Sequence, residues 1–84
     1  MGLTWDDKSR MEAYGRDAGN ALSRPAMLDA AEMIAASADP YEQEVLKVCF
    51  NLGLGGTYAD TYERELIRSQ LQKRTRELLG TLDA

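Results

Sequence analysis

The chain contains no histidine and only one cysteine among its 84 residues. Histidine is the commonest metal ligand and the side chain that most often transfers protons near neutral pH. Cys49 has no second cysteine for an internal disulfide and no imidazole to activate its thiol. We therefore expect no enzymatic activity, no catalytic residue, no metal site and no cofactor. The lone cysteine, expected to be buried, also predicts a reducing, cytoplasmic location.

Long apolar runs are missing as well. A membrane-spanning helix needs about 20 predominantly apolar residues, and no segment approaches that length. The first ten residues, MGLTWDDKSR, have neither the basic start nor the apolar stretch of an export signal. We expect neither export nor a membrane anchor.

Positive charge is scarce in the first half of the chain. Residues 1–42 carry four basic and eight acidic side chains, whereas residues 43–84 carry six of each, so the net charge of −4 arises from the first half. An acidic protein is a poor general ligand for nucleic acid, and direct nucleic-acid binding is not favoured. The acidic half could instead imitate nucleic-acid charge and inhibit a nucleic-acid enzyme.

Four helical patterns and no strand pattern run along the sequence. Cap residues precede three of the patterns, and either Thr57 or Asp60 can cap the last. We predict an all-α bundle of about four helices, at residues 4–22, 24–36, 40–53 and 60–79, in a single domain of residues 1–84. The caps of the first three are Thr4, with Asp7 completing a capping box, Ser23, and Asp39, with Glu42 at the box position.

Apolar residues at helical spacing define the predicted inner faces. In chain order the four stripes are Met11, Tyr14, Ala18 and Leu22; Met27, Ala31, Ile34 and Ala38; Tyr41, Val45, Val48 and Leu52; and Ile67, Leu71 and Leu78. Leu46, Cys49 and Phe50 widen the third stripe beyond half of its helix. We therefore expect the third helix to pack between the first and the fourth. Its wide apolar face also predicts a homodimer or an exposed apolar patch.

Glycines raise two structural questions. Gly15 and Gly19 lie one turn apart in the first predicted helix, where they either permit close approach of another backbone or break the helix. The stretch NLGLGGTYAD follows a helix and lacks the lysine of a phosphate-binding loop, so we interpret Gly53, Gly55 and Gly56 as a helix stop. Gly80 is expected to end the last helix in the same way.

Residues 41–79 resemble the end of the cytoplasmic domain of the DotU/IcmH family of bacterial secretion proteins. The resemblance is carried by Cys49, Leu52, Gly53, Gly56 and Tyr58 in one helix and turn, and by Glu65, Leu66, Arg68 and Leu71 in the next helix. The family is several times longer and has a membrane anchor. The resemblance implies an all-α fold and a scaffold role without chemistry.

Arginines beside leucines on the last helix indicate a protein-binding surface, because arginine is enriched in binding hot spots. The candidate partner-binding residues are Arg64, Leu66, Arg68, Arg76 and Leu79. We expect a small acidic protein-binding module, an adaptor or a regulatory inhibitor of another protein, of bacterial or phage origin. A secretion-scaffold relative and an acidic nucleic-acid mimic are the alternatives.

Overall fold

Four α-helices make up the part of the chain that the computed structural model describes, residues 2–83, with side chains described to residue 80. They are α1 (Trp5–Asn20), α2 (Arg24–Ala36), α3 (Pro40–Gly55) and α4 (Thr61–Asp83). Within the described range there is no strand. The prediction of an all-α bundle of about four helices is confirmed.

The helices begin at the predicted caps. Thr4 Oγ1 accepts a hydrogen bond from the Asp7 N–H at 3.1 Å, and the Thr4 N–H donates to Asp7 Oδ2 at 3.2 Å. These two bonds are the expected capping box. Side chains cap the other three helices by accepting a backbone N–H: Ser23, Asp39 and Asp60.

Two details of the predicted starts differ from the structure. Glu42 does not reach back to its cap; its carboxylate accepts a hydrogen bond from Ser37 Oγ at 3.0 Å. The structure uses Asp60 to cap α4, because the Thr57 hydroxyl donates instead to the Leu54 carbonyl oxygen at 2.7 Å.

The predicted glycine stop of α3 is confirmed in part, since α3 ends within the glycine stretch with Gly56 as its C-cap, two residues later than expected, whereas the predicted stop at Gly80 is wrong. α3 continues past Gly53 to Gly55, and Gly56 follows it with a φ of −93°. α4 likewise continues through Gly80 to Asp83. No glycine of the described chain has a positive φ. Gly53 lies inside the helix, at a position where the α1 backbone packs too closely to leave room for a side chain.

The end of α1 uses a leucine where glycine is usual. Leu22 has a φ of 48°, and the Ser23 N–H donates to the Ala18 carbonyl oxygen at 3.2 Å. This six-residue bond around a left-handed residue is a Schellman motif. Leu22 therefore turns the chain toward α2 in a backbone conformation that costs a residue with a Cβ roughly 1–2 kcal/mol.

Leu22→Ile is expected to lower the free energy of unfolding by about 1–2 kcal/mol, because a second γ-carbon on Cβ makes the left-handed backbone still less favourable. Leu66→Ile is the matched control: Leu66 is 46% exposed, Leu22 57%, and Leu66 lies in regular helix. We expect the control to change stability by less than about 0.7 kcal/mol. Urea unfolding measures both values, and equal losses would contradict a backbone origin.

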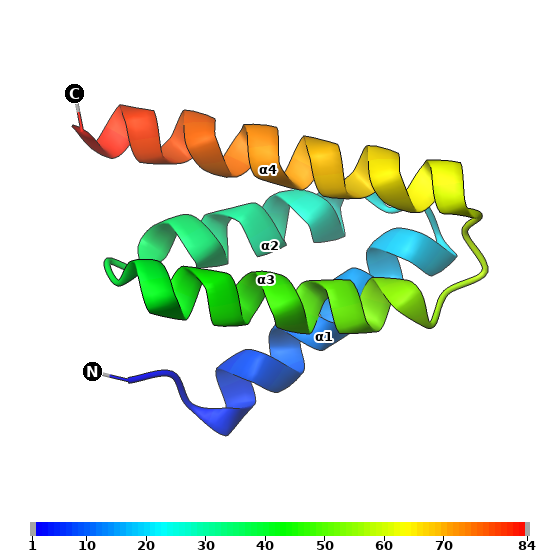
Figure 1. Cartoon of the computed structure of the whole chain (residues 1–84), viewed down its shortest axis with the longest axis horizontal. Coiled ribbons are helices and arrows are strands. Elements are labelled where there is room, and N and C mark those ends of the chain that lie inside the picture. The colour runs from blue at the N-terminus through cyan, green and yellow to red at the C-terminus, as the bar shows by residue number, and fades with distance from the viewer. Residues whose placement is uncertain (1, 84) are drawn as a thin grey trace.

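The helices pair as α1 with α3 and α2 with α4. Figure 1 shows α2, α3 and α4 roughly alongside one another, with α1 crossing α3 obliquely. The expectation that α3 lies between α1 and α4 is therefore wrong, since α3 makes few contacts with α4. α2 separates them instead.

Glycines bring α1 and α3 into backbone contact. A Cβ on Gly15 would lie 2.0 Å from the Phe50 carbonyl oxygen, and a Cβ on Gly53 would lie 1.9 Å from the Glu12 carbonyl oxygen. One turn further on, a Cβ on Gly19 would lie 2.3 Å from the Thr57 side chain. α1 is continuous through Gly15, so of the two alternatives for these glycines the structure shows close approach.

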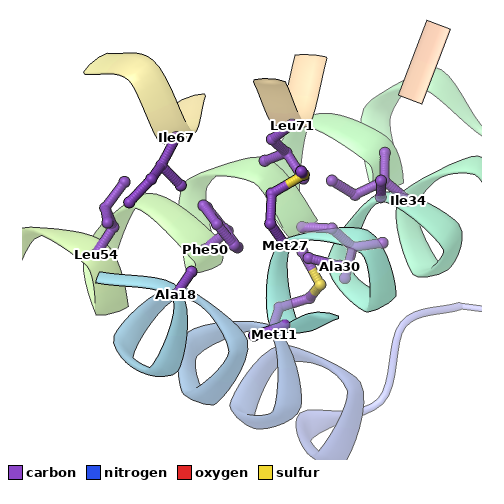
Figure 2. Packing of buried hydrophobic residues seen from close by; sticks show 12 residues of the cluster. Met11, Ala18, Met27, Ala30, Ile34, Phe50, Leu54, Ile67 and Leu71 are labelled. Carbon is purple, nitrogen blue, oxygen red and sulfur yellow. The ribbon is translucent and has the colours of Figure 1, made fainter. Parts of the chain in front are cut away.

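The core lies where the four helices meet. Its largest fully buried side chains are Phe50, Met11, Ile34, Leu46 and Leu54. Figure 2 shows Met27 of α2 reaching toward Leu71 of α4 while Met11 approaches from α1. The predicted stripes of α1, α2 and α4 supply much of this core, with Tyr14 and Leu78 at its margin, but Leu22 and Ala38 are exposed beyond the helix ends.

The predicted inner stripe of α3 is wrong, although Leu46 and Phe50, which were predicted to widen it, are buried. Tyr41, Val48 and Leu52 are exposed, and the buried residues lie on another face: Leu46, Phe50, Gly53 and Leu54. α3 is apolar on both faces, so periodicity could not decide which one packs. Gly53 decides it, because α1 can approach closely only on the glycine side.

Candidate protein-binding surfaces

An apolar strip runs along the outside of α3, which we call the outer seam: Tyr41, Val45, Val48 and Leu52. Tyr41 is 75% exposed, Val48 56% and Leu52 65%, and Val45 is half-buried. The spacing of four, three and four residues is that of the apolar seam of a two-helix coiled coil. The outer seam thus has the pattern of a helix-packing surface, but three of its four side chains are exposed to solvent.

A second candidate surface is the α2–α4 groove, a hollow of about 350 Å³. Its floor contains Met27, which is buried, and Leu28, which is half-buried. The remaining lining residues are polar or charged: Arg24, Gln70, Lys73, Arg74 and Glu77. Apolar floors with arginine at the rim are typical of protein interfaces.

Charge distinguishes the α2–α4 groove from the rest of the surface. Three cationic side chains line it against one carboxylate, in a chain whose net charge is −4. Arg74 Nη1 lies 3.4 Å from Glu77 Oε2, while Arg74 Nε is buried and without a hydrogen bond to any described residue. Arg24 and Lys73 are exposed. The groove is therefore a local positive site.

Elsewhere, carboxylates accompany many of the basic side chains. The ion pairs are Arg10 with Asp6, Arg16 with Glu12, Lys47 with Glu44, and Arg68 with Glu65. Each links residues three or four apart on one helix, and such exposed pairs contribute little to stability. Their main effect here is to neutralise four basic side chains of α1, α3 and the first half of α4.

Two of the predicted partner-binding residues have structural contacts. Arg64 is half-buried, and its Nη2 donates to the Thr57 carbonyl oxygen at 2.8 Å, which ties the α3–α4 connection to α4. Arg68 Nε donates to Asn51 Oδ1 at 3.3 Å and so links α4 to α3. Reversing these charges would therefore disturb packing within the protein as well as any contact with a partner.

The other three predicted partner-binding residues do not share a face. Leu66 is exposed beside a small hollow that Leu22 and Met27 also line. Leu79 is half-buried, and Arg76 is exposed. At 100° per residue, Leu66 and Leu79 are turned about 140° away from each other around α4. The structure does not bring the five residues together on one surface.

Sequence reasoning missed the α2–α4 groove because its residues come from two helices. Arg24 and Met27 belong to α2, whereas Lys73 and Arg74 belong to α4. Lys73, Arg74 and Arg76 indicate positive charge on the last helix. It could not be combined with Arg24 without knowing that α2 packs on α4.

Cys49 is half-buried between α3 and α1, rather than buried as predicted. Burial raises the pKa of its thiol, Lys8 opposes this shift, and Glu12 adds to it. A thiol with a raised pKa holds less thiolate at neutral pH and is a weaker nucleophile. The side chain packs against the core as a small apolar group.

The fold and these surfaces define a small all-α protein. Among residues 2–83, no helix is long and apolar enough to cross a membrane. In the same range no cluster of three or more histidine, cysteine, aspartate or glutamate side chains could hold a metal ion. No family model matches the chain, and no curated protein or solved structure is significantly similar to it. The DotU/IcmH resemblance stays a prediction.

Proposed function

We propose that this protein is a non-catalytic protein-binding module, an adaptor or regulatory inhibitor, which holds an acidic segment of another protein in the α2–α4 groove. The observation that carries the proposal is the grouping of Arg24, Lys73 and Arg74 around Met27 and Leu28. Arginine and methionine are enriched in protein interfaces, and arginine is among the commonest hot-spot residues.

Charge complementarity favours an acidic partner segment. Carboxylates of a partner would meet the exposed cations Arg24 and Lys73, while a leucine-sized side chain would cover the apolar floor. Such charge pairing accelerates association and makes it sensitive to salt. The expected ligand is therefore an amphipathic helix with leucines on one face and glutamates flanking them.

A labelled amphipathic peptide of this composition tests the proposal by fluorescence anisotropy. Arg24→Glu/Lys73→Glu should weaken its binding at least tenfold, and raising the salt concentration should weaken binding to the wild type. The matched control Arg10→Glu/Arg16→Glu changes net charge by the same amount on exposed side chains of α1 outside the groove. We expect it to retain binding.

Three outcomes would overturn the proposal. The first is no binding of the glutamate peptide, and the second is equal binding of an otherwise identical lysine peptide. The third is equal loss in both double variants, which would move the interface out of the groove. A single-stranded oligonucleotide that binds more tightly than the peptide would favour a nucleic-acid ligand in its place.

A further inference from the structure

The outer seam of α3 is explained neither by the fold nor by the α2–α4 groove. Its pattern extends by one exposed position, to Gly55 at the end of the helix, so that five positions alternate by four and three residues. A repeat of this kind places every member on one side of a helix, where it packs into a facing helix. We propose that two copies of this chain pair through their outer seams, with the two α3 helices antiparallel.

Self-complementarity of the outer seam favours a second copy as its occupant. A two-fold axis at the midpoint between Val45 and Val48 relates Tyr41 of one copy to Leu52 of the other, and Val45 to Val48. Two-fold interfaces require such reciprocal contacts. The valines of the two copies meet at the centre, and Tyr41 pairs with Leu52 at both ends, so the outer seam is complementary in shape to a second copy of itself.

Charge favours the antiparallel orientation. Residues 39–47 carry the carboxylates Asp39, Glu42 and Glu44 and one cation, Lys47, which pairs with Glu44, so this half keeps an excess of negative charge, whereas residues 48–56 contain no charged side chain. A parallel pair would place the two acidic halves beside each other, and like charges facing each other across an interface are destabilising. In the antiparallel pair each acidic half faces the uncharged half of the other copy.

The size of the seam sets the expected strength. α3 has 16 residues and so is about 24 Å long. A contact between two such helices is smaller than the roughly 1,200–2,000 Å² of a standard stable interface. We therefore expect a dimer that dissociates in the micromolar range, about 10–100 μM, and is populated at high protein concentration.

Disulfide cross-linking tests both the occupant and the orientation. In a Cys49→Ser background, Val45→Cys and Val48→Cys are made on copies of different mass. The antiparallel pair brings residue 45 of one copy to residue 48 of the other, so oxidation of the mixture should give the mixed disulfide and little of either like pair. Cross-linking within each variant alone would show a parallel pair and overturn the proposal.

Sedimentation equilibrium gives an independent measurement without cysteines. The wild type should dimerise, and Val48→Lys/Leu52→Lys should be monomeric at concentrations where the wild type is mostly dimer. Both residues are more than half exposed, so the variant should fold, which circular dichroism verifies. Leu66→Lys, an exposed leucine on α4, should leave the dimer intact. A monomeric wild type at 500 μM, or a dimer unaffected by the double variant, would overturn the proposal.

This inference does not depend on the proposed function. The outer seam and the α2–α4 groove share no residue. Loss of the dimer should leave the peptide affinity of each groove unchanged, and the groove variant Arg24→Glu/Lys73→Glu should still dimerise. The two experiments can therefore fail separately.

Discussion

Gly53→Ala is expected to lower the free energy of unfolding by at least about 3 kcal/mol, the upper end of the usual range for a single substitution. The new methyl group would lie 1.9 Å from the Glu12 carbonyl oxygen and 2.9 Å from the Arg16 backbone nitrogen. Both neighbours are backbone atoms of α1, so no side chain can rotate away. α1 and α3 must separate, which also disrupts the core they enclose.

This loss is a large part of the total stability, since a domain of this size has about 4–13 kcal/mol. Gly55→Ala is the control on the same helix, because a Cβ there meets nothing within 4 Å. It should be neutral or stabilise by up to about 1 kcal/mol. Urea unfolding gives the free energy of unfolding of both variants. Equal values for Gly53→Ala and Gly55→Ala would contradict the close contact between α1 and α3.

Phe50→Ala is expected to lower the free energy of unfolding by about 3–5 kcal/mol, through lost apolar burial and the cavity left behind. Phe50 is fully buried and contributes to the region where α1, α2 and α3 meet (Figure 2). Its backbone carbonyl also faces Gly15. The cavity would therefore form directly beside the crossing of α1 and α3, where the glycines leave no side chain that could move to fill it.

Tyr58→Ala is the matched aromatic control. Tyr58 is 95% exposed, and its hydrogen bond to Asn20 Oδ1 comes from the backbone N–H, which alanine keeps. Its free energy of unfolding should change by less than about 0.5 kcal/mol. Calorimetric melting of both variants distinguishes the two values. Similar melting temperatures would mean that Phe50 is not a central core residue.

The starts of the helices could be predicted from the sequence because each is specified within four residues. A cap side chain such as Ser23 or Asp39 bonds to a backbone N–H two or three positions later, so the signal and its partner lie in one short segment. The ends were less predictable. Glycine at position 53 is typical of a helix stop, but it can also serve a contact with a helix about 38 residues earlier in the chain, and local sequence does not distinguish the two.

Packing could be predicted where a helix has one apolar face and not where it has two. α4 has one such face, and Ile67 and Leu71 are buried as expected. α3 has two, and the longer apolar stripe, with Val48 and Leu52, is the one left outside. The candidate partner-binding residues were predictable to the same extent. The sequence shows that α4 carries arginines, but it does not show which of them bond to other parts of the protein. Arg64, for example, donates to the Thr57 carbonyl oxygen outside α4.

The crossing of α1 and α3 also determines how relatives of this chain could be recognised. Gly53 and Thr57 follow Gly15 and Gly19 by the same 38 residues, and both pairs have a spacing of four. Side chains elsewhere can be exchanged for others of similar volume, whereas none of the three contact glycines, Gly15, Gly19 and Gly53, has room for even a methyl group. Divergent relatives would therefore keep small residues at these four positions after their apolar pattern and surface charge had changed. A search for two pairs of small residues, each spaced by four and 38 residues apart, should find such relatives where overall sequence similarity does not.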